Sequence, residues 1–331
     1  MTVAGTIVVC GLSAALLAQP QDDARGSFTA WLDGVRAEAL TRGIRHEIVE
    51  RALGDLEEPV AVVIERDRAQ TERVLPLEAY LTRRLTPTVV RTGREMMALH
   101  HPTLSQVSER YGVPAALIAS IWGVESNFGR FSGIRPTVAA LATLAWDPRR
   151  ADFFRGELFD ALEILNRGDI DVADMRGSWA GAMGQPQFMH GRRDIWNSTS
   201  DVFASIANYL RGHGWTPGIG WGREVSVPPD ALTRIAAEVT QRSGSCQAVR
   251  DMTTPLPLRE WRRLGVRTAG GAPLPAGDAT ASLVSGSTRH FLVYSNYDAI
   301  LEYNCSHAYA LSVALLGDRL SRTTKAPVAA R

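Results

Sequence analysis

Only one acidic residue stands between Tyr111 and Trp146, and it lies in an apolar segment. This residue is Glu125, in the sequence PAALIASIWGVESNFGR. On a helix through this segment, Glu125 shares a face with apolar residues three, four and seven positions earlier. An ionised carboxylate on an apolar face is costly without a partner, so the protonated form should persist near neutral pH. Such a group can donate a proton to a glycosidic oxygen.

A structural role for Glu125 is the alternative. A glutamate in the last turn of a helix often reaches solvent or pairs with an arginine, and Arg130 and Arg135 follow closely. The spacing alone leaves both interpretations open.

A second segment carries groups that suit a sugar ligand. Residues 177–189 read GSWAGAMGQPQFM, and their small side chains let the backbone approach a ligand closely. Ser178, Gln185 and Gln187 offer neutral hydrogen-bonding groups, while Trp179 and Phe188 offer apolar faces. A tightly packed helix start explains the same composition equally well.

The elements around these segments are predominantly helical. Apolar residues recur near a 3.6-residue period from 28 to 107, with breaks at Pro87 and Pro102, and again over 151–169 and 201–212. After Trp215 proline and glycine multiply, and EVSVPP and HFLVYSNYDAILEYN are typical of strands. The final element, HAYALSVALLGDRL, is again typical of a helix.

These patterns predict an α+β protein, mainly α, with a small β-containing insertion. The predicted regions are a signal peptide at 1–18, a helical region with the lysozyme-like catalytic core at 28–215 and a small β-containing subdomain at 216–298. A C-terminal helix that returns to the core follows at 299–320, and a tail at 321–331.

Four stretches together resemble a known family. GVESNFG, GSWAGAMGQPQFM, ANYLRGHGW and the ending YN-x-S-x-x-YAL occur in the order and rough spacing of the B-type lytic murein transglycosylases. The resemblance runs from about Phe28 to Leu320. It implies a lysozyme-like helical core with an N-terminal helical region and a small β-containing part. It also implies cleavage of the β-1,4 bond between N-acetylmuramic acid and N-acetylglucosamine in peptidoglycan.

The resemblance assigns roles residue by residue. The family's catalytic acid falls on Glu125, which protonates the glycosidic oxygen and then acts as base on the muramyl C6 hydroxyl, giving a 1,6-anhydro product. The substrate's N-acetyl group replaces a second carboxylate, although a distant acid such as Asp147 is a candidate for that role. The residues implied to bind substrate are Ser178 and Gln187 in the cleft and Tyr209, Tyr303, Asn304 and Tyr309 in its walls.

The sequence departs from the family pattern after Met189. Roughly a dozen residues are missing there, about the length of a calcium-binding loop. Only Asp194 and Asp201 remain as candidate ligands, and calcium prefers six or more oxygens, so we expect no metal and no cofactor. The neighbouring Arg192 and Arg193 either replace the ion with a salt-bridge clamp or are solvated surface charges. The loss of a cleft-lining loop puts activity in question.

The N-terminus predicts export. Residues 2–18 are uncharged, too short for a comfortable membrane span, and followed by a polar segment, as in a secretory signal for the periplasm. No basic residue precedes the apolar run, and an uncleaved anchor is the alternative. Removal of the signal would remove Cys10 and leave Cys246 and Cys305, which form either a disulfide or two buried thiols.

Composition excludes several classes of protein. The 331-residue chain has 36 Lys+Arg and 35 Asp+Glu, without the basic excess of a nucleic-acid-binding protein, and three cysteines do not make a disulfide scaffold. The expected partners are peptidoglycan glycan strands, with peripheral association with other cell-wall enzymes and a monomeric state. The competing functions are a non-cutting peptidoglycan binder, a muramidase that releases a reducing end, and a purely structural helical protein.

Overall fold

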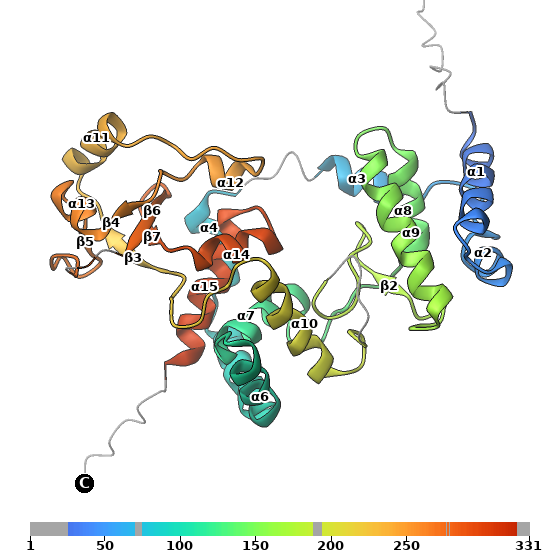
Figure 1. Ribbon diagram of the computed structural model, residues 1–331, viewed down its shortest axis with the longest axis horizontal. Coiled ribbons are helices and arrows are strands. Elements are labelled where there is room, and N and C mark those ends of the chain that lie inside the picture. Colours follow the sequence, from blue (N-terminus) through green and yellow to red (C-terminus); the bar gives the residue numbers. More distant parts are fainter. Residues whose placement is uncertain (1–25, 70–74, 188–193, 276, 278, 323–331) are drawn as a thin grey trace, which may run out of the picture.

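The computed structural model describes residues 26–69, 75–187, 194–275, 277 and 279–322, and its elements gather around three hydrophobic cores (Figure 1). We name these the α7 core, the α9 core and the sheet core. Within the described ranges, every helix is too short or too polar to cross a membrane.

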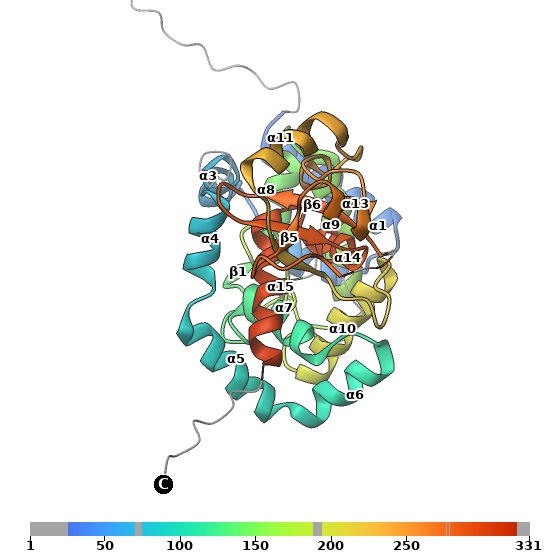
Figure 2. The same ribbon diagram turned by 90° about the vertical axis from the view of Figure 1, so that its left-hand side faces the viewer.

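The α7 core is built from helices drawn from both ends of the chain. They are α4 (Leu77–Arg84), α5 (Pro87–Leu99), α6 (His101–Tyr111), α7 (Ala115–Ser126), α10 (Thr199–Gly212), α14 (Asn296–Tyr303) and α15 (His307–Ser321). Helix α7 is apolar on all sides because α5, α10 and α15 surround it. In Figures 1 and 2, α7 and α15 lie side by side, although Tyr309 of α15 lies 184 positions after Glu125 of α7.

The α9 core joins the N-terminal helices to the centre of the chain. Its helices are α1 (Phe28–Thr41), α2 (His46–Leu53), α3 (Ala61–Ala69), α8 (Thr137–Trp146) and α9 (Ala151–Arg167). A short antiparallel pair of strands, β1 (Arg135–Pro136) and β2 (Arg176–Gly177), opens onto the glycine-rich segment. The helical region predicted over 28–215 thus contains two separate cores.

The sheet core holds a five-stranded antiparallel sheet in the order β4-β6-β7-β3-β5. Its strands are β3 (Gly222–Ser226), β4 (Leu256–Pro257), β5 (Arg267–Thr268), β6 (Thr280–Ser285) and β7 (His290–Val293), with α11 (Pro229–Glu238), α12 (Gln247–Arg250) and α13 (Leu258–Arg263) between them.

The two faces of the sheet belong to different cores. Leu283 and Leu292 pair across β6 and β7 and pack into the sheet core, whereas Phe291 and Val293 pack into the α7 core. Successive side chains of a strand point to opposite faces, so the central hairpin fastens the insertion to the helices of the α7 core.

One stretch differs from its predicted structure. The segment HFLVYSNYDAILEYN is a strand only over His290–Val293, and Asn296–Tyr303 is the helix α14. The carboxamide of the fully buried Asn296 binds the backbone of Thr216 at 2.7 and 2.8 Å and the Ile219 carbonyl at 2.7 Å. These tertiary bonds and the burial of one helical face override the strand propensity of its tyrosines and isoleucine. The predicted boundary at residue 298 falls inside α14.

Candidate active site

The chain turns sharply at the end of α7, directly after Glu125. Helix α7 ends at Ser126, and both Asn127 and Phe128 adopt left-handed backbone conformations, with φ of 51° and 59°. The Ser126 hydroxyl donates to the Trp122 carbonyl at 3.0 Å and accepts from the Gly129 amide at 3.1 Å, which locks the turn. The Glu125 side chain therefore projects from a rigid helix end.

Glu125 lines a cavity of about 330 Å³ beside α4 and the start of α5. Burial raises the pKa of its carboxyl to about 7, and the bond from Tyr309 and the positive charge of Arg84 oppose that rise. The Tyr309 hydroxyl donates to Oε1 of Glu125 at 2.5 Å. The described residues that line the cavity are Arg83, Arg84, Val89, Gly123, Val124, Glu125, Ser126, Asn127 and Phe131. Glu125 is the one carboxylate in this set.

Three tyrosines named from the sequence form a continuous row that ends on Glu125. The ring centres of Tyr309 and Tyr303 are 6.3 Å apart and nearly parallel, and those of Tyr303 and Tyr209 are 4.9 Å apart. The Tyr303 hydroxyl donates to the Pro186 carbonyl at 3.0 Å, and the Tyr209 hydroxyl donates to a backbone carbonyl of α14 at 2.8 Å. Burial raises the pKa of Tyr303 and Tyr309, so both remain neutral hydrogen-bond donors.

Gln185 ties the glycine-rich segment to α7. Its Oε1 accepts from the Trp122 indole at 2.8 Å, and its Nε2 donates to the Trp196 carbonyl at 2.8 Å. A Cβ at Gly129 would lie 2.5 Å from Gln185 Oε1, so only glycine fits there, with φ of 77°. Sequence reasoning named Gln185 only as a neutral polar group, because its role depends on a contact 63 residues away.

Ser178, Gln187 and Asn304, also named from the sequence, have different surroundings. The Ser178 hydroxyl accepts from the Ala180 and Ala182 amides at 3.2 and 3.1 Å, so it holds its own turn together. Gln187 has φ of 54°, and its Nε2 donates to the Gly184 carbonyl at 2.8 Å. Asn304 is exposed just after α14. None of the three lines the Glu125 cavity as the described residues define it.

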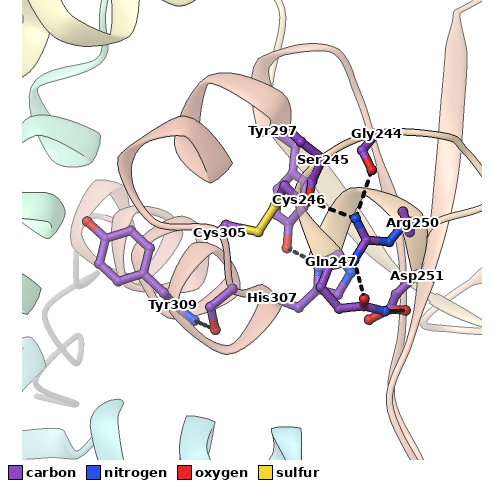
Figure 3. The surroundings of a disulfide bond; sticks show 11 residues. Gly244, Ser245, Cys246, Gln247, Arg250, Asp251, Tyr297, Cys305, His307 and Tyr309 are labelled. Atoms are coloured by element: carbon purple, nitrogen blue, oxygen red, sulfur yellow. Dashed lines mark hydrogen bonds between the residues drawn. A yellow bond between two sulfur atoms is a disulfide. The ribbon is translucent and has the colours of Figure 1, made fainter. Parts of the chain in front are cut away.

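Cys246 and Cys305 form a disulfide with their Cα atoms 5.9 Å apart (Figure 3). Cys246 precedes α12 of the insertion, and Cys305 lies in the turn between α14 and α15. In Figure 3 the Tyr309 side chain lies on one side of this bond and the bonded pair Arg250 and Gln247 on the other. The cross-link thus anchors the turn that delivers Tyr309 to Glu125.

The remaining acids named from the sequence lie elsewhere. Asp147 follows α8, where its carboxylate accepts from the Arg149 amide at 3.0 Å and lies 3.7 Å from Arg68. Asp194 Oδ1 accepts from the amides of Trp196 and Asn197, and Asp201 lies in the first turn of α10. Across the described residues, no three His, Cys, Asp or Glu side chains gather in a metal-binding arrangement. Arg192 and Arg193, proposed from the sequence as a clamp, fall outside the described residues.

The cavity also contains residues that sequence reasoning missed. Arg83, Arg84 and Val89 reach it from α4 and α5, and Asn127 and the 52% exposed Phe131 reach it from the turn after α7. The sequence around these residues carries no motif that predicts a function. They reach the site only because tertiary packing brings α4 against the turn after α7. An exposed aromatic ring beside a buried acid is a surface on which a sugar face can stack.

The sequence and the fold of the chain both match a known family. A family model described as the Transglycosylase SLT domain matches residues 27–318. The chain belongs to this family. Its fold is the lysozyme-like fold of the lytic transglycosylases, mainly α with a small sheet.

Individual relatives support the assignment to the transglycosylase family. The chain is 35% identical over 261 residues to membrane-bound lytic murein transglycosylase B of Escherichia coli K12, an alignment that covers 73% of this chain and 66% of that one. The crystal structure of SltB3 from Pseudomonas aeruginosa in complex with NAG-NAM-pentapeptide matches with a TM-score of 0.78 and 39% identity over 89% of this chain and 80% of that one. SltB1 of the same species matches with a TM-score of 0.74 and 27% identity over 88% and 98%.

Proposed function

We propose that the chain is a peptidoglycan lytic transglycosylase, which cleaves the β-1,4 bond between N-acetylmuramic acid and N-acetylglucosamine and forms a 1,6-anhydromuramyl end. The observation that carries this proposal is the Glu125 carboxyl, buried beside a cavity without a second acid among its described residues. The similarity to SltB3, whose structure holds NAG-NAM-pentapeptide, supports peptidoglycan as the substrate.

The electrostatics of Glu125 suit a group that acts twice. With a pKa of about 7, a large fraction of the carboxyl is protonated at neutral pH and can donate to the glycosidic oxygen. The resulting carboxylate is then the base that removes the proton from the muramyl C6 hydroxyl. The O–H of Tyr309 holds Oε1 in place through both steps and stabilises the charged form.

The absence of a second acid from the described lining favours substrate assistance. A retaining hydrolase with two carboxylates places them about 5 Å apart, and Glu125 has no such neighbour in this lining. The acetamido group of the muramyl residue then stabilises the positive charge at C1 until the C6 oxygen attacks. The product gains no water, in contrast to that of a muramidase.

Mass spectrometry of the soluble muropeptides released from purified sacculi tests this proposal. The wild-type chain should release products one water lighter than reducing-end muropeptides, and Glu125→Gln should release none. Glu109→Gln, an exposed carboxylate change on α6, is the matched control and should cut normally. Reducing-end products would identify a muramidase, and sedimentation with sacculi without products would identify a binder in which the loop missing after Met189 has abolished cutting.

The location and assembly of the chain form part of the same proposal. Residues 1–18, which lie outside the described range, act as an export signal, and the enzyme works in the periplasm as a monomer on glycan strands. The curated E. coli relative is named membrane-bound. Cell fractionation and analytical ultracentrifugation of the exported protein test both statements.

A further inference from the structure

Two arginines line the Glu125 cavity, and Arg84 acts on Glu125 through its charge but forms no direct ion pair with it. Arg83 and Arg84 end α4, and both line the cavity together with Glu125. The Arg84 Nε donates to the Tyr80 hydroxyl at 3.2 Å, with its guanidinium 5.5 Å from the centre of that ring. Within the described part of the chain, neither guanidinium forms an ion pair with a carboxylate, whereas Arg242 and Arg289 form bidentate pairs with Asp298 and Glu224.

Capping of the helix end does not account for these two charges. Positive side chains are favoured near the C-terminus of a helix because its last carbonyls are unsatisfied. Among the described residues, however, neither Arg83 nor Arg84 donates to a carbonyl at the end of α4, and the carbonyl of the C-cap residue Leu85 accepts from Arg319 at 2.7 Å. Arg83 and Arg84 are therefore available for a ligand in the cavity.

The chemistry of a glycan strand identifies what these arginines would recognise. The sugar hydroxyls and acetamido groups are neutral, so they provide no counter-charge for a pair of guanidinium groups. The muramyl residue differs from N-acetylglucosamine by the lactyl group on O3, which carries a carboxylate itself or, when amide-linked, a peptide with carboxylates. Guanidinium groups bind carboxylates with strong, planar, bidentate hydrogen bonds.

We propose that Arg83 and Arg84 form a subsite for a carboxylate carried on the lactyl substituent of the muramyl residue. This inference rests on the proposed function, since it names a specificity determinant of the same cavity. The pair selects muramyl units over plain N-acetylglucosamine units and orients the muramyl C1 toward Glu125. The lactyl carboxylate and a carboxylate of the attached peptide share this chemistry and are separated by the ligands below.

Calorimetric binding to the full exported chain carrying Glu125→Gln tests the subsite without turnover. The ligands are chitobiose, the disaccharide GlcNAc-MurNAc, and GlcNAc-MurNAc-pentapeptide. We expect the carboxylate-bearing ligand that uses the subsite to bind about tenfold more tightly than chitobiose at low salt. The advantage should shrink in 0.5 M NaCl, where the Debye length falls to about 4 Å. If GlcNAc-MurNAc binds more tightly than chitobiose, the subsite recognises the lactyl carboxylate. If only GlcNAc-MurNAc-pentapeptide binds more tightly, the subsite recognises a carboxylate of the peptide.

Substitutions then locate the subsite. In the double variant Arg83→Gln/Arg84→Gln the advantage should fall below about twofold. The control Arg91→Gln, an exposed arginine on α5 outside the cavity lining, should keep it. The double variant Arg83→Lys/Arg84→Lys keeps both positive charges and should retain part of the affinity advantage. Equal melting temperatures of the variants and the parent would show that the glutamine variant loses the advantage through its charge and not through misfolding.

Two results would overturn the inference in distinguishable ways. The arginine subsite is wrong if the parent binds all three ligands with equal affinity. It is also wrong if the affinity advantage of the carboxylate-bearing ligand persists in Arg83→Gln/Arg84→Gln. Neither result contradicts the proposed function. Failure of the parent to bind any of the ligands sinks the subsite together with the proposed substrate.

Discussion

Two of the carboxylates that the described part of the chain shelters from water, Asp67 and Glu125, have opposite surroundings. Asp67 on α3 is 3% exposed and is held by two arginines, with Arg149 at 3.2 Å and Arg150 in direct contact. Glu125 has a tyrosine hydroxyl as its direct partner, and burial raises its pKa to about 7. Breaking a buried ion pair destabilises a fold, whereas a buried acid whose direct partner is a neutral hydroxyl is costly and is found where its proton is useful. The comparison therefore separates structural from chemical carboxylates.

The largest expected effect is the loss of cutting in Glu125→Gln. The amide can accept the Tyr309 hydrogen bond but cannot transfer a proton, so release of muropeptides should fall by at least about 10³-fold. The rate of release from labelled sacculi measures this loss. Activity within tenfold of wild type would remove Glu125 from the mechanism and end the contrast with Asp67.

Asp67→Asn should show the reverse pattern. The substitution removes the ion pairs that hold the buried side chain of residue 67 to two exposed arginines, and the free energy of unfolding should fall by about 2 kcal/mol. Release of muropeptides should stay within twofold of wild type. Asp33→Asn is the control, because it breaks an exposed ion pair with Arg36 and should change stability by less than about 0.5 kcal/mol. The contrast fails if Asp67→Asn and Asp33→Asn unfold alike.

The pH dependence of stability sharpens the comparison. Because the pKa of Glu125 is raised from 4.5 to about 7 on folding, the folded state holds a proton that the unfolded state has lost between these values. The free energy of unfolding of wild type relative to Glu125→Gln should therefore fall as pH rises from about 4.5 to 7, by roughly 1–3 kcal/mol, and level off above. Urea titrations of both proteins at several pH values measure the difference. A flat difference would mean an ordinary, solvated glutamate.

Tyr309→Phe should have a smaller effect with a distinctive signature. The lost hydrogen bond stabilises the ionised carboxylate, so the pKa of Glu125 should rise above 7 and the alkaline limb of kcat/KM should move to higher pH. The maximal rate should drop about tenfold. Tyr303→Phe is the control, because its hydroxyl donates to Pro186 rather than to Glu125. If the maximal rate falls but the alkaline limb of the kcat/KM profile stays at the same pH, Tyr309 has a packing role only.

The buried acid was easier to find in the sequence than the residues that surround it. Glu125 is visible in the sequence because an isolated acid in an apolar helix violates the usual pattern, and that violation needs no tertiary knowledge. The tyrosine row came from the family resemblance, since each tyrosine alone suits a core equally well. Arg83 and Arg84 could not be found, because their place depends on how α4 closes over a turn some 40 residues later.

The fold shows the same division between local and tertiary information. The helix starts at Thr86 and Ser306 follow from local chemistry, with a side-chain cap at each and a proline at the first. The helix α14 was mistaken for a strand because its buried Asn296 is satisfied by residues 77 and 80 positions earlier. Periodicity over eight residues cannot convey such bonds.

The bond between Cys246 and Cys305 closes a covalent ring that spans 59 residues of the sequence and includes β6, β7 and α14. In the chain-entropy description such a ring stabilises the fold by about 4 kcal/mol. It also confers tolerance of proteolysis: a single cut in any loop of the ring leaves both fragments attached, and the turn before Tyr309 stays tethered. A nicked chain should run as one band on a non-reducing gel and as two after reduction, so one cut within the ring leaves the two fragments of the enzyme joined.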